Sequence, residues 1–376
     1  MKPKLRFKEF NSDWNTYKFY ELVTIKNGQV DPNDEQYRNL PHIGPGNIEK
    51  ETGRLLEYNL AKDDKLVSSK YLFDKESVIY GKINPHFAKV CYPKFVGLCS
   101  ADAYPINPIK DKLTSEFLLY LLLNPQFTKF ATSVSMRTGM PKINRDELSI
   151  YKFTIPEIAE QFKIGNMLTL LDKKIELQSK KIEDLKLFKK GLIHQMKKSN
   201  NNWSEYKISE IFKITRGVVI PKTDLLDNKT TEYQYPVYSS QTSNNGILGY
   251  DTKFDFDGKY LTWTTDGANA GKVFYRNGKF RCTNVCGVLY NDNNKYVDEL
   301  TAELLNYETP KHVSYVGNPK LMNNVMGDIK IFLPDSNESD RVSNILLIIN
   351  NKVLLETDKL NKLNKLKKGL MQKMFV

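Results

Sequence analysis

The chain has 376 residues, of which 56 are Lys or Arg and 44 are Asp or Glu, and hydrophobic residues make up 40% of it. This length predicts two to three domains, and the apolar content argues against wholesale disorder. The longest apolar run, residues 117–123, is too short to cross a membrane, and the first ten residues lack the apolar segment of a secretory signal. Four cysteines do not make a disulfide framework, so we expect a cytoplasmic protein, and the net charge of +12 favours an acidic partner such as nucleic acid.

An internal repeat organises the chain. Trp14 and Tyr17 recur as Trp203 and Tyr206, at an offset of 189. Further along, residues 156–196 match residues 334–374 without a gap, at an offset of 178. Identities at this second offset include Glu160/Glu338, Asn166/Asn344, Leu168/Leu346 and Lys181/Lys359, and the block Lys189-Lys190-Gly191-Leu192, which recurs as Lys367-Lys368-Gly369-Leu370. A shared gap-free pattern of this length predicts a duplication, with a variable globular part and a well-matched tail in each copy.

Each tail carries apolar residues at heptad spacing, which predicts a long helix that forms a coiled coil. The seam positions near the middle of the tails are Leu168, Leu171, Ile175, Gln178, Ile182 and Leu185 in the first copy, and Leu346, Ile349, Val353, Glu356, Leu360 and Leu363 in the second. Lys189 and Lys367 interrupt the seam near the end of each tail.

The polar seam residues favour an antiparallel pairing of the two helices. A parallel pairing would stack Lys189 on Lys367, and the two like charges would repel. The alternative is that each helix packs on its own domain or on another chain. The tails also hold much of the excess charge, because residues 159–200 have 10 basic against 5 acidic residues and residues 336–376 have 8 against 4. That charge fits either a solvated helix face or a surface for an acidic partner.

The globular parts mix strand and helix patterns, so the predicted class is α+β. Short β-branched and aromatic runs at residues 77–80, 260–263 and 272–275 predict strands, and residues 114–130 and 298–306 predict helices, the first of which Pro125 can break. The Asn277-Gly278 dipeptide predicts a hairpin turn. We therefore expect a first globular domain at 1–155, a coiled-coil helix at 156–199, a second globular domain at 200–333 and a second coiled-coil helix at 334–376.

Polar loops in both domains offer side chains that can bind a nucleic acid. Asn, Gln, Arg and Lys can read base edges, and Ser and Thr suit phosphates, although the same residues are common in ordinary turns. The candidates in the first domain are Lys82, Asn84, His86, Lys89, Arg137, Thr138 and Lys142. Those in the second domain are Ser239, Ser240, Gln241, Thr242, Thr264, Thr265, Asp266, Asn269, Lys272 and Lys320.

Motifs of catalysis are mostly missing, which is in keeping with a chain that does no chemistry itself, and we expect no metal site. The sequence has neither a P-loop nor a nucleophile elbow, and Cys282 and Cys286 lack a second ligand pair, which favours packing over zinc. Asn84-Pro85-His86-Phe87 resembles the Asn-Pro-Pro-aromatic motif of DNA adenine methyltransferases. That motif would need a glycine-rich cofactor turn upstream, which is absent, so a plain Asn-Pro turn is favoured.

The duplicated architecture resembles the specificity subunit of type I restriction–modification systems, with two target-recognition domains. The matching features are the Lys4-Leu-Arg-Phe opening, the segment Trp14 to Gly28 with its repeat, and both Gly-x-Pro-Lys segments, at 139–142 and 317–320. They also include both Lys-Lys-Gly-Leu tails, and residues 264–275 with 282–287 of the second domain, which are similar to a recurrent target-recognition domain. The resemblance covers the whole chain.

This resemblance implies a role as well as a fold. Each domain would read one half of a bipartite DNA target, and the antiparallel helices would set the gap between the halves. The helices would dock two modification subunits, which bind S-adenosylmethionine and methylate adenine, and a restriction subunit can join them. The alternatives are a specificity subunit of a type IIB-like system, a self-sufficient DNA adenine methyltransferase, and a coiled-coil adaptor without a DNA role.

Overall fold

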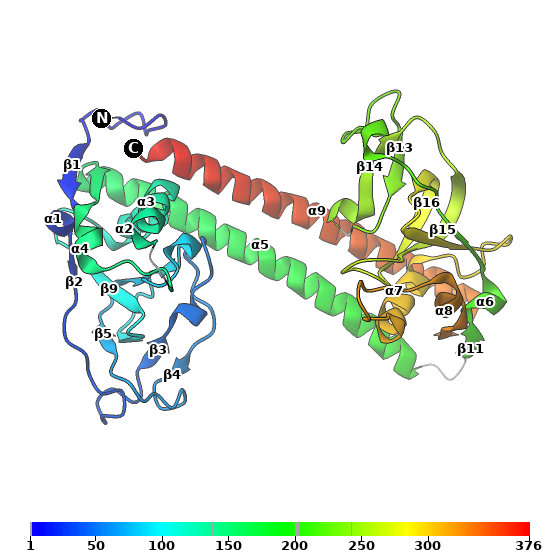
Figure 1. The fold of residues 1–376 in the computed structure, drawn as a ribbon, viewed down its shortest axis with the longest axis horizontal. Coiled ribbons are helices and arrows are strands. Elements are labelled where there is room, and N and C mark those ends of the chain that lie inside the picture. The colour runs from blue at the N-terminus through cyan, green and yellow to red at the C-terminus, as the bar shows by residue number, and fades with distance from the viewer. Residues whose placement is uncertain (1, 137–138, 200–202, 242) are drawn as a thin grey trace. The chain divides into compact units, whose positions relative to one another are not determined.

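The computed structural model describes residues 2–136, 139–199, 203–241 and 243–376. The chain divides into two compact units, residues 1–179 with 358–376 and residues 180–357. Both long helices, α5 (Ile158–Ser199) and α9 (Ser336–Met374), contribute to each unit (Figure 1). Because these divisions fall inside the helices, the domain boundaries at 155, 199 and 333 stay a prediction. None of the helices in the described ranges is long and apolar enough to span a membrane.

The globular part of the first unit combines small sheets with short helices. One sheet has the order β2-β9-β6-β7, another has the order β4-β3-β8-β5, and β1 pairs with β10. The strands are β1 (Asn15–Lys18), β2 (Val23–Ile25), β3 (Pro41–Ile43), β4 (Asn59–Leu60), β5 (Tyr71–Phe73), β6 (Val78–Gly81), β7 (Val90–Cys91), β8 (Gly97–Cys99), β9 (Ala103–Pro108) and β10 (Lys152–Ile155). The helices are α1 (Phe19–Leu22), α2 (Ser115–Leu122), α3 (Pro125–Ser135) and α4 (Arg145–Ile150), with 3-10 turns η1 (Pro45–Asn47) and η2 (Pro85–Phe87).

The second unit is built on a larger sheet of order β12-β17-β15-β16-β13-β14, and β11 pairs with β18. Its strands are β11 (Ser204–Lys207), β12 (Lys213–Arg216), β13 (Tyr235–Tyr238), β14 (Ile247–Asp251), β15 (Phe256–Thr264), β16 (Val273–Cys282), β17 (Cys286–Tyr290) and β18 (Lys330–Leu333). Its helices are α6 (Ile208–Ile211), α7 (Glu299–Glu308) and α8 (Asn323–Asp328), with 3-10 turns η3 (Lys222–Asp224), η4 (Ser243–Gly246) and η5 (Thr309–His312). The predicted α+β class is confirmed in both units.

The sequence repeat has a direct structural counterpart in the paired strands that begin and end each globular part. Tyr17 of β1 lies opposite Phe153 of β10, and Tyr206 of β11 lies opposite Ile331 of β18, in antiparallel register. A short helix follows at once in both units, α1 in the first and α6 in the second. The segments with matched Trp-x-x-Tyr and apolar-Pro sequences are therefore neighbours in space.

The long helices pack antiparallel within each unit. In the first unit Leu168 of α5 shares a buried core with Met371 of α9, and in the second Met196 shares one with Val342. Lower numbers on α5 thus pair with higher numbers on α9, as we expected from the seam lysines. The side chains at the predicted seam positions are all buried or half-buried: 168, 171, 175, 178, 182 and 185 on α5, and 346, 349, 353, 356, 360 and 363 on α9.

Local capping explains where several helices begin. Asp298 accepts a hydrogen bond from the amide of Thr301 at the start of α7, and Asp335 accepts one from the amide of Glu338 at the start of α9. The predicted helix at 114–130 is two helices, because Asn124 caps α3 through the amide of Gln126 and Pro125 takes the first helical position.

The hairpin turn predicted at Asn277-Gly278 is wrong. These residues lie inside β16, where Asn277 is opposite Lys259 and Gly278 is opposite Gly258 of β15. Both glycines have positive φ, so the pair of strands bends at this point without ending. Buried side chains lie on both sides of the dipeptide, Arg276 before it and Phe280 and Cys282 after it, so the strand runs through it. The turn that joins β15 to β16 falls at residues 265–272 instead.

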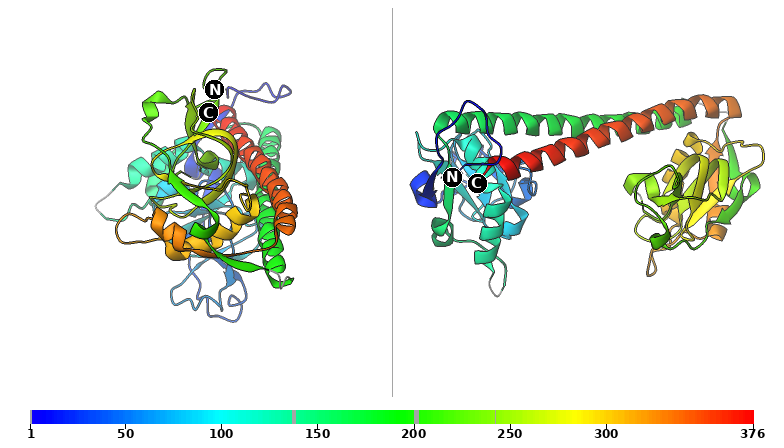
Figure 2. Two further views of the ribbon diagram at one scale, coloured as in Figure 1. Left: turned by 90° about the vertical axis from the view of Figure 1, so that its right-hand side faces the viewer. Right: turned by 90° about the horizontal axis from the view of Figure 1, so that it is seen from above.

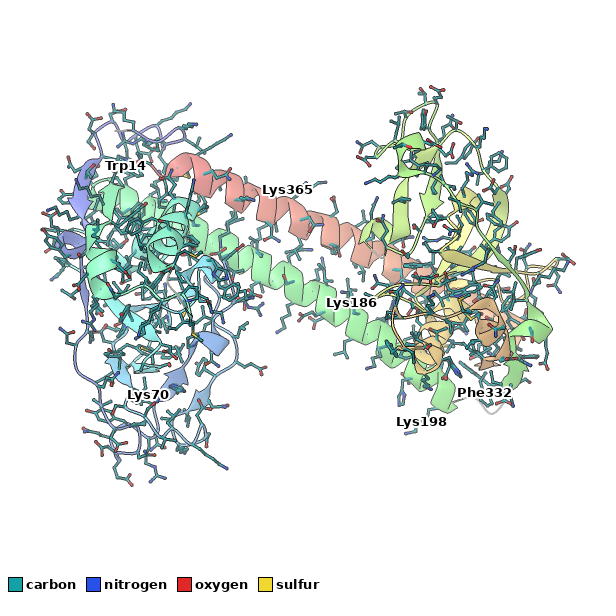
Figure 3. All side chains as sticks on the ribbon, in the orientation of Figure 1. Trp14, Lys70, Lys186, Lys198, Phe332 and Lys365 are labelled. Carbon is teal, nitrogen blue, oxygen red and sulfur yellow. The ribbon has the colours of Figure 1, made fainter. Side chains whose placement is uncertain are left out.

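A buried ion pair fixes the N-terminal segment onto α5. Arg6 donates two hydrogen bonds to Glu160, at 2.8 and 2.7 Å, and the indole of Trp14, labelled in Figure 3, donates a third at 3.2 Å. The Glu160 side chain is fully buried. The amide of Leu5 also donates to the carbonyl of Lys373, so the N-terminal and C-terminal segments lie side by side (Figure 2).

We predict that Glu160→Gln destabilises the first unit by about 3 kcal/mol, because it leaves the Arg6 charge without its partner. Glu183→Gln, on an exposed position of the same helix, is the matched control and should change the free energy of unfolding by less than about 0.5 kcal/mol. Urea denaturation of both variants measures the difference. Equal midpoints for the two variants would contradict the prediction.

Candidate nucleic-acid interface

In the first unit, two of the loops singled out from the sequence meet at the end of β6. The amide of Asn84 donates to the carbonyl of Pro141 at 2.8 Å, and the amide of Ile143 donates to the carbonyl of Lys82 at 3.1 Å. Ile83 and Lys142 form an isolated antiparallel bridge between these bonds. The loop after β6 is therefore held by the Gly-x-Pro-Lys segment, which recurs in the second copy of the repeat.

The second unit holds the same arrangement at the end of β15. The amide of Gly267 donates to the carbonyl of Pro319 at 2.9 Å, and the amide of Leu321 donates to the carbonyl of Thr265 at 2.9 Å. Asp266 and Lys320 form the intervening bridge. The two clamped loops thus share a backbone hydrogen-bonding pattern, although their side chains differ.

A second shared bond closes each loop on its other side. The amide of Gly81 donates to the carbonyl of Lys89, and the amide of Thr264 donates to the carbonyl of Lys272. Lys89 and Lys272 were both candidate contact residues, and the loops place them at equivalent points. The Lys89 ammonium bonds to the carbonyl of Pro45, whereas the Lys272 side chain is exposed.

Cationic side chains gather around Tyr104 in the first unit. Lys82 is only 8% exposed, and its ammonium lies 5.0 Å from the centre of the Tyr104 ring. Burial lowers the pKa of Lys82, and the nearby charge of Lys142 lowers it further. The guanidinium of Arg145 lies 5.4 Å from the same ring and donates to the carbonyl of Lys26. Arg145 was missed from the sequence, because its position at the start of α4 places it here only through the fold.

In the second unit the candidate threonines are buried, whereas other side chains of the loop are exposed. Thr264 and Thr265 are buried, and Thr265 donates from its hydroxyl to Asp266 at 2.5 Å. The same carboxylate lies 3.8 Å from Arg216, a residue outside the candidate loops of the sequence. Asn269, Lys272 and Lys320 are exposed, so these candidate side chains can meet a ligand here.

The candidate loop after β13 is braced by its neighbours. The Thr283 hydroxyl bonds to that of Ser239 at 2.9 Å, and the Gln241 amide bonds to the carbonyl of Ile247. Arg276, another residue that the sequence did not single out, stacks its guanidinium 3.6 Å from the Tyr238 ring and is only 4% exposed.

The remaining candidates differ in how far the structure can place them. Asn84 has positive φ and precedes η2, so the Asn84-Pro85 dipeptide forms a turn, and His86 in that turn is exposed. Ser240 is half-buried. The predicted contacts Arg137, Thr138 and Thr242 lie outside the described residues.

The cysteine pair of the second unit is packed in the core. The sulfur atoms of Cys282 and Cys286 are 3.5 Å apart, and both side chains are buried. Across the described ranges, no group of three or more His, Cys, Asp or Glu side chains is placed to hold a metal ion. Both cysteines belong to a buried cluster with Phe280 and Val288, so their side chains contribute to packing.

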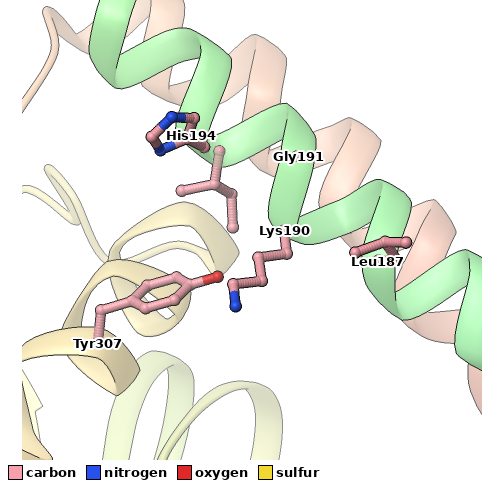
Figure 4. A pocket seen from close by; sticks show the side chains of 6 residues that line it. Leu187, Lys190, Gly191, His194 and Tyr307 are labelled. Atoms are coloured by element: carbon pink, nitrogen blue, oxygen red, sulfur yellow. The ribbon is translucent and has the colours of Figure 1, made fainter.

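A cavity of about 420 Å³ lies in the second unit between α5 and α7 (Figure 4). It is lined by Leu187, Lys190, Gly191, Ile193, His194 and Tyr307.

We predict that Gly217→Ala destabilises the second unit by about 3 kcal/mol. Gly217 donates from its amide to the carbonyl of Cys286 beside the candidate loops, and an added methyl group would overlap the carbonyl of Cys282. Gly46→Ala is the control, because its added methyl group meets open space. Thermal unfolding compares the two variants, and an unchanged Tm in Gly217→Ala would refute the steric argument.

Comparison with known proteins shows which family this chain resembles. The sequence model of the type I restriction modification DNA specificity domain matches twice, at residues 11–187 and 200–365. A Mycoplasma pneumoniae protein described as a type I specificity subunit, S.MpnORF615P, is 34% identical over 206 residues, which are 53% of this chain and 81% of that one. The specificity subunit of the Escherichia coli type I restriction enzyme EcoDI is 35% identical over 153 residues, 41% of this chain and 33% of that one.

A solved structure has the same fold over the full length. The S subunit of a type I restriction–modification system from M. genitalium superposes with a TM-score of 0.72 and 17% identity, covering 100% of this chain and 99% of that one. The double match of the family model covers most of the sequence. The chain therefore belongs to the type I restriction modification DNA specificity domain family, as a type I specificity subunit with two copies of that domain.

Proposed function

We propose that each globular unit binds one half of a bipartite double-stranded DNA target. The observation that carries this proposal is the clamped strand-end loop, which recurs in both units with the same backbone bonds and different side chains. A shared frame can hold both loops at a DNA groove, while different side chains at the tips select different bases. The loops offer the Lys, Asn and Gln groups that suit base edges and phosphates.

Local charge supports binding in the two units to different degrees. The first has the cationic group of Lys82, Lys142 and Arg145 around Tyr104. Residues 201–335 carry 15 basic and 16 acidic residues, so the second unit depends on exposed single side chains such as Lys320. Phosphate contacts made by partner subunits would add to its affinity.

Repeated exposed apolar positions on the long helices support docking of two modification subunits. Leu170 on α5 and Ile348 on α9 are equivalent in the repeat and are 68% and 67% exposed. Leu177 and Leu355, seven residues further on, are also exposed. Large apolar side chains that recur on exposed helix faces are typical of interaction sites. Because the same pattern occurs on both helices, it fits two copies of one partner.

Two glycines extend this pattern. Gly191 and Gly369 occupy the same heptad position as these leucines, and a methyl group at either would meet nothing within 4 Å in this chain. Glycine in a helix interior costs about 1 kcal/mol relative to alanine. A close approach by a partner would explain why both copies keep this cost.

The chemistry in this proposal belongs to the partners. The modification subunits would bind S-adenosylmethionine and methylate adenine within the target, and a restriction subunit can complete a nuclease. This chain would supply recognition and assembly. A type IIB-like complex would use the chain in the same way, and the genes beside its own would distinguish the two systems.

We predict that replacing residues 201–335 with the equivalent domain of another family member changes one half of the methylated motif and leaves the other half unchanged. The reason is that each unit carries its own clamped loop. Single-molecule sequencing of native DNA from cells that express the complex reads both halves and the gap. A change in both halves of the motif would contradict separate reading by the two units. If deletion of this gene left DNA methylation unchanged, the adaptor role would be favoured.

We also predict that Gly191→Ala with Gly369→Ala raises the Tm of the free chain, since each substitution stabilises its helix by about 1 kcal/mol. The same pair should weaken assembly with modification subunits about tenfold, because the added methyl groups crowd the partner. Asn364→Ala, at an exposed position of α9 away from this heptad position, should leave assembly unchanged. Analytical ultracentrifugation of the complexes measures the affinities, and equal affinities for both variants would rule out docking at the glycines.

A further inference from the structure

Two lysines interrupt the apolar seam at equivalent places. Lys189 on α5 and Lys367 on α9 are 178 residues apart, and their side chains are only 20% and 13% exposed. A lysine at a seam position lowers the stability of a helix pair relative to an apolar residue. The hydrogen-bond partners of the two ammonium groups show which interactions offset this loss of stability.

In the second unit, Lys189 joins three helices. Its ammonium donates to Glu303 of α7 at 2.8 Å and to the side-chain oxygen of Asn350 of α9 at 2.9 Å. The Asn350 amide then donates to Glu299 of α7 at 2.5 Å. The lysine and the asparagine thus bind α7, the helix that packs on β16, to both long helices.

In the first unit, Lys367 makes the corresponding links. Its ammonium lies 2.6 Å from the carboxylate of Asp172 on α5 and donates to the carbonyl of Thr52, in the loop before β4, at 2.9 Å. The other oxygen of Asp172 accepts a hydrogen bond from the hydroxyl of Tyr120 on α2 at 2.9 Å. Burial raises the pKa of Asp172, while the charge of Lys367 opposes that shift.

The two networks connect equivalent positions of the repeat through different chemical groups. Asp172 and Asn350 are equivalent in the repeat, so the partner helix supplies a carboxylate in one unit and an amide in the other. The carboxylate missing from α9 is provided by α7 through Glu303. In each unit one seam lysine is bonded to the other long helix and to the globular part. A link that survives with different partners in the two copies points to a shared role.

We propose that Lys189 and Lys367 are positioning residues that hold each globular domain in one orientation on the helix pair and so fix the spacing between the two half-sites. The inference rests on the proposed function. Each lysine makes partly buried, charge-assisted hydrogen bonds, and losing such a bond shifts a local opening equilibrium by roughly tenfold to a hundredfold. A domain freed from this link can present its loop at more than one distance along the DNA.

The experiment compares four forms of the full chain in complex with modification subunits: wild type, Lys189→Met, the exchange Lys189→Glu with Glu303→Lys, and Lys186→Met. Lys186 lies three residues away on an exposed position of α5 and is the matched control (Figure 3). In the exchange variant the Asn350 amide can turn, so that its nitrogen donates to the new carboxylate at position 189 and its oxygen accepts from the new ammonium at position 303. The bond from Asn350 to Glu299 is lost, but α5, α7 and α9 stay linked. Hydrogen–deuterium exchange reports protection of α7, and native-DNA sequencing reports the half-sites and the gap.

Lys189→Met is expected to lower the protection of α7 about tenfold and to add methylated sites whose gap differs by one base pair, with both half-sites unchanged. The exchange variant should recover protection and the single gap, and Lys186→Met should match the wild type. Unchanged protection in Lys189→Met, or no recovery in the exchange variant, would overturn the link. Lower protection with an unchanged gap would overturn the positioning role. A wild-type complex without split-motif methylation would instead overturn the proposed function, while the exchange data still test the link.

Discussion

The apolar seam of the two long helices is the constraint on which the rest of the molecule depends. In each unit the seam residues of α5 and α9 are part of the same buried core as the short helices of the globular part, as Leu168 with Phe117 and Leu346 with Leu300 illustrate. The helices are therefore not a separate linker, because removing them would open the core of both units. This shared core explains why the compact units divide the chain inside the helices, at residues 179 and 357.

The two copies of the repeat share a backbone framework, whereas the side chains of their loops differ. The antiparallel strand pairs, the helix that follows each of them and the clamped strand-end loops are formed by backbone hydrogen bonds, which do not depend on side-chain identity. The side chains at the loop tips are not needed for that frame. A binding surface can therefore diverge in one copy without loss of the fold, and this is the property that the proposed reading of two different half-sites requires.

Sequence patterns predicted the regular parts of the molecule well and the loops less well. The heptads and the break at Pro125 depend on neighbouring residues, so they could be identified in advance. The Asn277-Gly278 turn failed because a dipeptide that favours a turn can also bend a strand when its partner, here Gly258, bends with it. The roles of Arg145, Arg216 and Arg276 depend on contacts with residues that are distant in sequence, and no local pattern marks them.

The sequence by itself determined the duplication, the coiled-coil tails, the α+β class and the family resemblance, because periodicity, repeats and composition can be read directly along the chain. It also indicated which loops carry polar side chains. Only the tertiary structure decided that the loop after β6 meets residues 141–143 and that the loop after β15 meets residues 319–321. It alone showed that the seam lysines find their partners on α7 and on the loop before β4. These contacts join segments far apart in the chain, and the packing of the cores, which no short window of sequence contains, brings them together.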